Sequence, residues 1–168
     1  MKVFLIGLPG SGKTTWGKQL AEKLSITFID LDLEIERREG KTVQEIFAIK
    51  KENYFREVES RTLKNLCSDT SSFVMATGGG TPCFFDNMEL MNKSGKTFFL
   101  DPPVSEITSR LLKTNLSERP LFAKLGTDQL KDKIQWLRSQ RISFYKQAHT
   151  TIDTSFVSLD DLAQKITY

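Results

Sequence analysis

One octapeptide of the chain reads GLPGSGKT, with three glycines, a lysine and a threonine at fixed spacing. Gly7, Gly10 and Gly12 permit positive backbone φ angles and let successive N–H groups surround a phosphate without a Cβ in the way. Lys13 can then reach the β- and γ-phosphates of a nucleoside triphosphate, while the Thr14 hydroxyl can serve a magnesium ion. The pattern predicts that one loop binds the triphosphate through Gly10, Ser11, Gly12, Lys13, Thr14 and Thr15.

The segments on either side of this loop are those that a phosphate-binding loop requires. The apolar residues 3–6 predict a short buried strand, and residues 15–24 place Trp16, Leu20 and Leu24 on one face of a helix. The phosphates would also meet the partial positive charge of that helix's N-terminus. The alternative, a glycine-rich turn with a chance lysine, leaves the order of strand, loop and helix unexplained.

Two aspartates close the second apolar run, in the sequence FIDLD. In a parallel sheet, ligands bind beyond the carboxyl ends of the strands, so Asp30 and Asp32 should lie near the phosphate loop. If the chain stays extended, the two carboxylates share one side, where one supports magnesium and the other accepts a hydrogen bond from a substrate hydroxyl. The alternative is helix capping, which is strongest for Asp32 because a helical pattern follows.

A predicted helix near residue 60 carries charged groups on or beside its apolar face, which consists of Phe55, Val58, Leu63 and Leu66. At about 100° per residue, Glu59 lies inside this face, about 40° from Phe55, and Arg56 lies at its edge. An inward carboxylate needs a partner, and Arg56 can pair with it while presenting its free edge to a ligand carboxylate. The alternative is an ordinary surface pair between Arg56 and Glu52.

A second arginine lies on the inner stripe of the last long helix, which comprises Leu130, Ile134, Leu137, Phe144, Tyr145 and Ala148. Arg141 returns to within about 20° of the direction of Leu130. An inward arginine is costly unless it meets an anion, so Arg141 is a candidate for binding one. Lys133 and Arg138 lie off the stripe and should be solvated.

Three glycines follow the third apolar run of the chain. Gly78, Gly79 and Gly80 remove every side chain from a place where backbone amides could approach a small polar ligand. A flexible turn, the alternative explanation, needs only one or two glycines. The triple glycine therefore belongs to the predicted acceptor site.

The spacing of apolar runs predicts the architecture that positions these residues. Runs at residues 26–29, 72–75 and 97–100, with a weaker one at 151–152, indicate four further strands separated by helical patterns. Such alternation predicts an α/β fold with a five-stranded parallel sheet covered by helices on both faces. At 168 residues, the chain is expected to form a single domain.

Two regions are expected to be inserted into this alternation. Residues 31–66 should form a helical substrate-binding insert, and its segment from residue 42 opens with a capping box of Thr42 and Glu45. Residues 113–126 have weak periodicity and contain the tripeptide ERP. We expect this second region to be a mobile lid that excludes water from the site.

Bulk composition limits the other possible functions. A scattered net charge of +3 is too small to indicate nucleic acid, and no apolar run is long enough to span a membrane. The first strand leaves no room for a signal peptide, so we expect a cytoplasmic protein. Cys67 and Cys83 lack metal or disulfide spacing, and His149 has no catalytic partner nearby in sequence. Since no segment requires a protein partner, a monomer is expected.

Together these segments resemble the shikimate kinase family along nearly the whole chain. The resemblance rests on the order and spacing of GLPGSGKT, FIDLDLEIE, the segment from Ile46 to FREVE at Phe55, TGGG, RPL at Arg119 and RISFY at Arg141. It implies a three-layer P-loop kinase fold. It also implies ATP- and magnesium-dependent phosphorylation of the 3-hydroxyl of shikimate, a step toward chorismate and the aromatic amino acids.

The resemblance further implies a role for each candidate residue. Lys13 would hold the phosphates, and Thr14 and Asp30 would serve magnesium. Asp32 would bind the acceptor hydroxyl; a role as a base is less necessary, because a loose transition state gives the hydroxyl little reason to lose its proton early. Arg119 would close from the lid onto the transferring phosphate. The shikimate site would include Phe47, Phe55, Arg56, Gly78, Gly79, Gly80 and Arg141.

The chain also departs from the family in two segments. The run RISFY lacks a proline that the family often has between the arginine and the tyrosine, which bears on helix geometry. The residues before Glu118 and after Asp153 do not clearly match the elements that hold adenine. Arg110 is our candidate for stacking on the base.

Three alternatives remain open. Gluconate and nucleoside monophosphate kinases share the fold, and inward arginines alone do not separate shikimate from gluconate. A GTPase-type switch is suggested by NKSG at Asn92 and by FFLD ending at Asp101, although a glycine replaces the guanine-binding aspartate and two prolines after Asp101 indicate a loop. A nucleotide-binding module without catalysis is the third alternative.

Overall fold

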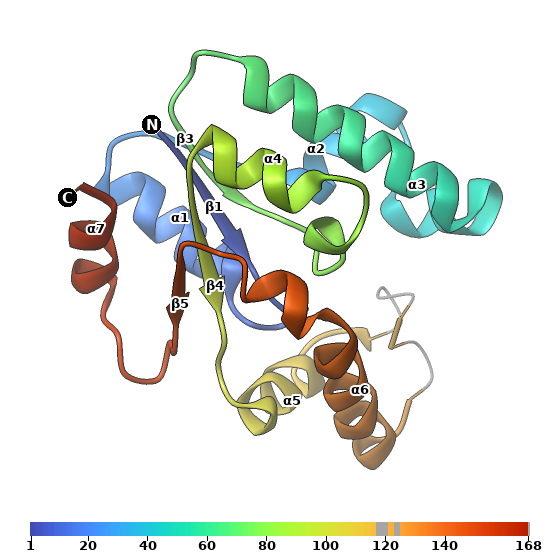
Figure 1. Cartoon of the computed structure of the whole chain (residues 1–168). Coiled ribbons are helices and arrows are strands. Elements are labelled where there is room, and N and C mark those ends of the chain that lie inside the picture. Colours follow the sequence, from blue (N-terminus) through green and yellow to red (C-terminus); the bar gives the residue numbers. More distant parts are fainter. Residues whose placement is uncertain (117–120, 123–124, 168) are drawn as a thin grey trace.

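A computed structural model describes residues 1–116, 121–122 and 125–167 of the chain. Five parallel strands form one sheet in the order β2-β3-β1-β4-β5 (Figure 1). The strands are β1 (Lys2–Ile6), β2 (Thr27–Asp30), β3 (Phe73–Ala76), β4 (Lys96–Leu100) and β5 (Thr150–Ile152). The predicted five-stranded parallel sheet is confirmed, including the weak fifth strand.

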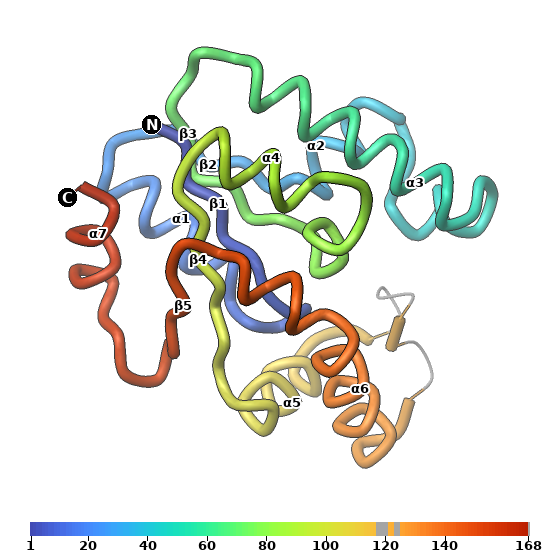
Figure 2. Tube along the Cα trace, in the orientation of Figure 1, coloured from blue at the N-terminus to red at the C-terminus, as the bar shows by residue number. Residues whose placement is uncertain are grey.

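Helices follow each of these strands. They are α1 (Lys13–Lys23), α2 (Leu31–Glu39), α3 (Val43–Ser68), α4 (Asn87–Ser94), α5 (Val104–Leu112), α6 (Thr127–Tyr145) and α7 (Leu159–Thr167), with a 3₁₀ turn, η1 (Thr81–Cys83). Figure 2 shows the chain leaving the sheet after β4, forming α5 and α6 at the lower edge, and returning as β5. The helices form layers on both sides of the sheet, as predicted.

Two apolar cores cover the two faces of the sheet, because successive side chains of a strand point to opposite sides. On β1, Phe4 and Ile6 pack with residues of α2 to α6, whereas Val3 and Leu5 pack with residues of α1 and α7. All four side chains are fully buried. This double burial explains why the strands appear in the sequence as continuous apolar runs rather than as alternating ones.

The carboxyl ends of three neighbouring strands carry the candidate site. The phosphate loop follows β1, Asp30 ends β2, and the glycines follow β3. Ala76 at the end of β3 pairs with Asp30 on one side and with Leu5 on the other. Because the strands are parallel and in this register, the three segments emerge at one edge of the sheet.

The start of α2 differs from one of our expectations. The helix begins at Leu31, and the Asp30 carboxylate caps it by accepting hydrogen bonds from the N–H groups of Asp32 and Leu33, at 3.2 and 3.4 Å. Asp30 is extended, but Leu31 and Asp32 are already helical, so the expected extended run from Asp30 to Asp32 does not form, and the capping role that we considered mainly for Asp32 belongs to Asp30. The cause is local, since an N-cap aspartate satisfies N–H groups that the first turn leaves free.

The capping box of α3 forms as predicted. Thr42 Oγ1 accepts from the Glu45 N–H at 3.2 Å, and the Glu45 carboxylate accepts from the Thr42 N–H at 2.7 Å. The helix is nevertheless interrupted at Lys51, whose φ of 70° and ψ of 173° are not helical. This backbone region is favourable almost only for glycine and costs other residues about 1–3 kcal/mol.

We expect Lys51→Gly to raise the free energy of unfolding by about 1 kcal/mol, because glycine relieves this strain at some cost in unfolded-state entropy. Urea denaturation measures the change. The matched control is Lys64→Gly, at an exposed and regular position of α3, which should lower stability by about 1 kcal/mol. Equal destabilisation by both substitutions would contradict the strained conformation of Lys51.

Candidate active site

A cavity of about 810 Å³ lies at the carboxyl edge of the sheet, between the phosphate loop, α2, α3 and α6. It brings together fifteen of the predicted site residues: Gly10, Gly12, Lys13, Thr14, Thr15, Asp30, Asp32, Phe47, Phe55, Arg56, Gly78, Gly79, Gly80, Arg110 and Arg141. Ser11 is fully buried and does not line the cavity. Arg119, like the rest of ERP, lies outside the described residues.

The phosphate loop has the backbone that its glycines permit. Gly7, Gly10 and Gly12 have φ angles of 143°, 81° and 95°, and Gly12 directly precedes α1. Lys13 is buried, and its ammonium group donates to the carbonyls of Gly7 and Leu8 at 2.9 and 2.8 Å. The loop therefore places a cation and a helix N-terminus together at the cavity, an arrangement suited to phosphate.

A hydroxyl and a carboxylate meet beside this loop. Thr14 Oγ1 donates to Asp30 Oδ2 at 3.1 Å, and both residues line the cavity. The other Asp30 oxygen, Oδ1, caps α2, so capping fixes the direction of the carboxylate. These two oxygen groups are of the type that Mg²⁺ prefers when phosphates and water supply its remaining ligands.

Asp32 lies deeper, in the first turn of α2. Its Oδ1 atom is buried and has no hydrogen-bond partner among the described residues. Burial raises the pKa of this carboxyl to about 7; Glu59 and Asp30 add to the increase, and Lys13 and Arg56 oppose it. An unpartnered acceptor aimed into a cavity is suited to a hydroxyl donor on a ligand.

This pKa predicts how the stability of the chain free of nucleotide and metal depends on pH. The pKa of the Asp32 carboxyl is about 7 in the folded chain and close to its ordinary value of 3.8 in the unfolded chain. Between these values the folded state holds a proton that the unfolded state has released, so stability falls as pH rises. Urea unfolding at several pH values should show this fall reduced in Asp32→Asn; an identical pH dependence in that variant would contradict the assignment.

Arg56 is held by two carboxylates and an aromatic ring. Its Nη1 donates to Glu59 Oε2 at 2.9 Å, while its Nε and Nη2 donate to Glu52 Oε1 at 3.2 and 3.1 Å. The guanidinium carbon also lies 4.2 Å from the centre of the Phe84 ring. The inward pair with Glu59 and the alternative pair with Glu52 thus form together. Phe84 was not identified from the sequence, because it belongs to a separate loop.

The three glycines after β3 each face a different functional group. A Cβ on Gly78 would lie 3.1 Å from Asp32 Oδ1, one on Gly79 3.1 Å from Arg141 Nη1, and one on Gly80 2.7 Å from Arg56 Nη1. Arg141 Nη1 is buried and has no hydrogen-bond partner among the described residues. The absence of side chains therefore lets one carboxyl and two guanidinium groups converge on the same short loop.

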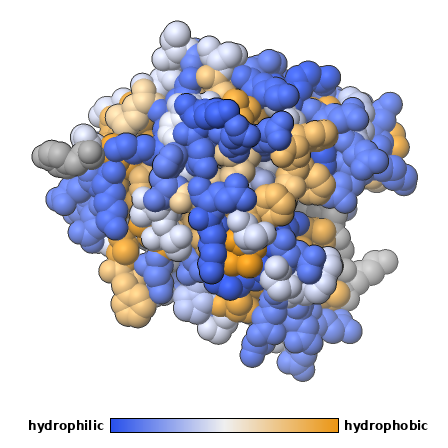
Figure 3. Space-filling model, in the orientation of Figure 1, coloured by the Kyte–Doolittle hydropathy of each residue, from blue (hydrophilic) through white to orange (hydrophobic). Residues whose placement is uncertain are grey.

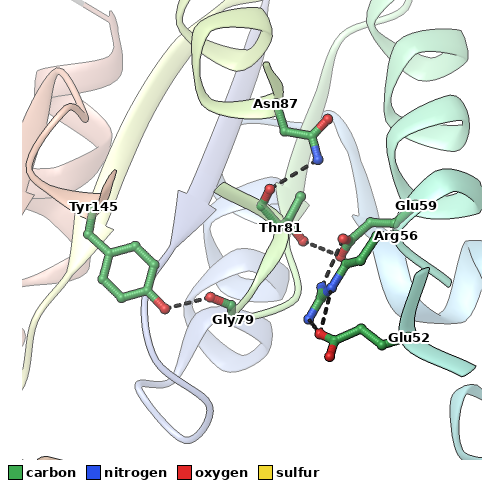
Figure 4. A network of polar contacts seen from close by, with 7 residues as sticks. All are labelled: Glu52, Arg56, Glu59, Gly79, Thr81, Asn87 and Tyr145. Atoms are coloured by element: carbon green, nitrogen blue, oxygen red, sulfur yellow. Dashed lines mark hydrogen bonds and ion pairs between the residues drawn. The ribbon is translucent and has the colours of Figure 1, made fainter. Parts of the chain in front are cut away.

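Tyr145 holds this glycine loop from the opposite side. Its hydroxyl donates to the Gly79 carbonyl at 2.5 Å (Figure 4). The centre of its ring lies 5.0 Å from that of Phe99 in the sheet. The residue is fully buried, and burial raises the pKa of its hydroxyl. Helical periodicity placed Tyr145 in the core but did not reveal this polar contact.

The remaining predicted residues lie at the two ends of the cavity. Phe47 and Phe55 form a ring pair with centroids 4.8 Å apart on the α3 side. Arg110 pairs with Glu106, and its Nη1 lies 3.5 Å from the Gly10 carbonyl, beside the phosphate loop. This position suits contact between Arg110 and a nucleotide whose phosphates lie in the loop and whose remaining part extends toward α5.

Two features that suggested a GTPase have structural roles. Asn92 accepts from the Thr97 hydroxyl at 2.6 Å and donates to the Gln147 carbonyl at 2.9 Å, so its side chain ties α4 to other elements. Asp101 pairs with Arg138 at 2.7 Å. Arg138, which we expected to be solvated, is thus a half-buried partner of Asp101. His149 is structural, because its Nδ1 accepts from the Thr97 N–H at 3.2 Å.

The cavity has a triphosphate-binding loop on one side and two arginines that can bind an anion on the other. This is the arrangement of a P-loop phosphotransferase with a small anionic acceptor. Comparison with known proteins narrows this class. A family model described as shikimate kinase matches residues 9–168. The chain is 39% identical to a shikimate kinase of Azobacteroides pseudotrichonymphae, over 98% of this chain and 96% of that protein.

Solved structures agree. A shikimate kinase from Bacteroides thetaiotaomicron superposes with a TM-score of 0.90 at 38% identity, covering 99% of this chain and 96% of the other. One from Acinetobacter baumannii, in complex with shikimate, has a TM-score of 0.86 at 36% identity, with coverages of 99% and 90%. The chain belongs to the shikimate kinase family.

Proposed function

We propose that this chain transfers the γ-phosphoryl group of ATP to the 3-hydroxyl of shikimate, giving shikimate 3-phosphate and ADP. The observation that carries the proposal is the glycine loop after β3, on which Asp32, Arg56 and Arg141 converge within one cavity. Asp32 can accept a hydrogen bond from a hydroxyl, and the two guanidinium groups beside it can bind a carboxylate. The site therefore fits a hydroxylated carboxylate such as shikimate. The structure of a relative in complex with shikimate supports this choice.

On the donor side, the chain supplies positive charge and fixed N–H groups. The loop from Gly10 to Thr15 surrounds the phosphates, and Lys13 neutralises charge that develops between the β- and γ-phosphates. Phosphoryl transfer passes through a loose transition state, so placement of the reactants and neutralised charge matter more than covalent help. Arg110 lies beside the loop, in position to contact the nucleotide base.

On the acceptor side, the chain orients the substrate. Arg56 and Arg141 bind the carboxylate, and Phe47 and Phe55 form an apolar wall. Asp32 Oδ1 accepts a hydrogen bond from the 3-hydroxyl of the substrate and so directs the oxygen of that hydroxyl toward the γ-phosphate. Binding and orientation suffice for Asp32, because the hydroxyl need not lose its proton early.

Magnesium is the metal that the pair of Thr14 and Asp30 fits. Among the described residues, no group of three or more His, Cys, Asp or Glu side chains could hold a metal ion. A hydroxyl and one carboxylate beside the phosphate loop suit Mg²⁺, which retains water and is bound largely through phosphates. When bound, the ion would neutralise phosphate charge, while Thr14 and Asp30 hold its position.

The lid, the domain organisation, the location and the assembly state complete the proposal. Residues 1–168 form one domain with a substrate-binding insert at 31–66 and a lid at 113–126, from which Arg119 closes onto the transferring phosphate.

No helix in the described part of the chain has the length and apolarity needed to cross a membrane. We place the reaction in the cytoplasm, where ATP is available. The face in Figure 3 is largely hydrophilic with separate apolar patches, which is compatible with a monomer.

The deciding experiment measures ADP release with ATP and magnesium in the presence of shikimate, gluconate, a nucleoside monophosphate or water alone. Shikimate should support the fastest turnover, and chelation of magnesium should stop it. Turnover with shikimate no faster than with water would refute the proposal. Faster turnover with gluconate would instead assign the two arginines to a different hydroxy acid.

A further inference from the structure

The buried carboxylate of Glu59 is shared between two donors. Its Oε2 accepts from Arg56 Nη1 at 2.9 Å, and its Oε1 accepts from the Thr81 hydroxyl at 2.6 Å (Figure 4). Glu59 and Thr81 are both fully buried. Each oxygen of this carboxylate thus has its own partner, and the plane of the carboxylate is fixed from both sides.

Thr81 is itself held firmly. It begins the turn η1, where its N–H donates to the Gly78 carbonyl at 3.2 Å and its carbonyl accepts from Asn87 Nδ2 at 3.0 Å. Pro82 follows and restricts the backbone. The Thr81 hydroxyl is therefore presented by a rigid segment that also carries the glycine loop.

The two carboxylates bound to Arg56 differ in how firmly they can hold it. The side chain of Glu52 is 53% exposed, whereas that of Glu59 is 0% exposed. An exposed partner is mobile and contributes little. A buried, doubly bonded carboxylate provides a fixed reference, so Glu59 sets the direction of the guanidinium.

Hydrogen-bond counting shows what Arg56 retains for a ligand. A guanidinium has five N–H groups, and the contacts with Glu52 and Glu59 use one each on Nε, Nη1 and Nη2. One N–H remains on each of Nη1 and Nη2, and two N–H groups on neighbouring nitrogens can bind a carboxylate bidentately. If Glu59 Oε1 lost its own donor, it would compete for one of these two N–H groups.

We propose that Thr81 is a positioning residue for the acceptor substrate: its hydroxyl satisfies Glu59 Oε1 and so keeps the outer N–H groups of Arg56 directed at the substrate carboxylate. This inference rests on the proposed function. Thr81 directly follows the triple glycine, which lines the cavity, but does not itself line it. Its effect therefore passes through Glu59 and Arg56.

The test compares three substitutions of one side chain. Thr81→Val keeps the shape without the hydroxyl, Thr81→Ser keeps the hydroxyl without the methyl group, and Thr81→Ala removes both without adding bulk. Thr108→Val is the matched control, because Thr108 is also buried but donates only to the Val104 carbonyl within α5. Kinetics are measured with shikimate and with its neutral carboxamide, and melting temperatures are recorded.

We expect Thr81→Val and Thr81→Ala to raise the KM for shikimate about tenfold, with little change in kcat or in the KM for ATP. Thr81→Ser and Thr108→Val should stay near the unaltered chain. For the carboxamide, which lacks the charge that Arg56 binds, kcat/KM should be the same with and without the Thr81 hydroxyl.

Three results would overturn the role of Thr81: an unchanged KM in the valine and alanine variants, equal impairment by serine, or an equal loss with the carboxamide. The last would indicate a general distortion of the site rather than an effect on carboxylate binding. Absence of shikimate turnover in the unaltered chain is a different outcome, since it would refute the proposed function before any variant is compared.

Discussion

Lys13→Met is expected to lower kcat for shikimate phosphorylation by about a thousandfold, the usual effect of removing a main electrostatic contact to a transition state. Methionine nearly preserves the length of the side chain but cannot neutralise phosphate charge. The KM for shikimate should change little, because Lys13 belongs to the phosphate loop rather than to the arginine side of the cavity. ADP release at saturating shikimate measures the effect.

The structure also sets the control for this variant. The Lys13 ammonium donates to the Gly7 and Leu8 carbonyls, so its loss could loosen the loop as well as remove charge. ATP binding by calorimetry and the melting temperature separate these effects. Lys18→Met, on the exposed side of α1, should behave as the unaltered chain. A kcat within tenfold of normal in Lys13→Met would contradict the role of the loop in catalysis.

Arg56→Ala and Arg141→Ala are each expected to raise the KM for shikimate by about a hundredfold, since loss of a buried charged hydrogen-bond partner costs roughly 2–5 kcal/mol. The KM for ATP should be nearly unchanged. Both guanidinium groups contact the glycine loop on the acceptor side of the cavity. Initial rates with varied shikimate measure the effect, and Arg61→Ala, on the exposed face of α3, is the control.

The two arginine variants should differ in stability although they resemble each other in binding. Arg56→Ala leaves the Glu59 carboxylate buried without its cation, which should cost about 3–5 kcal/mol of the free energy of unfolding. Arg141 has no ion pair among the described residues, so Arg141→Ala should be close to neutral. Urea unfolding tests the difference. Normal shikimate KM values in both variants would remove the carboxylate clamp.

Local signals made much of the site predictable from the sequence. Glycine spacing required the positive φ angles at Gly7, Gly10 and Gly12, and the structure has them. Helical periodicity placed Glu59 inside an apolar face with Arg56 three residues before it, and the two form an ion pair. These predictions succeeded because each depends on residues within one turn or one helix, where backbone geometry alone sets the direction of side chains.

The aspartates show where such reasoning ends. Asp30 ends β2 as predicted, whereas Asp32 lies in the first turn of α2, so the division of roles between them depended on where α2 begins. Capping by Asp30 turned the chain at once and directed Asp32 inward. Asp32 Oδ1 is buried and unpartnered because α3 and the glycine loop pack beside it. A local sequence pattern does not predict such contacts between distant segments.

The sequence by itself determined the parallel α/β sheet, the phosphate loop and the polar side chains that face the core. Only the tertiary structure decided which of these groups meet. Thr81 reaches Glu59 across 22 residues, and Tyr145 reaches Gly79 across 66. The physical reason is that periodicity fixes the face on which a side chain lies, whereas contacts between distant segments follow from the packing of sheet and helices.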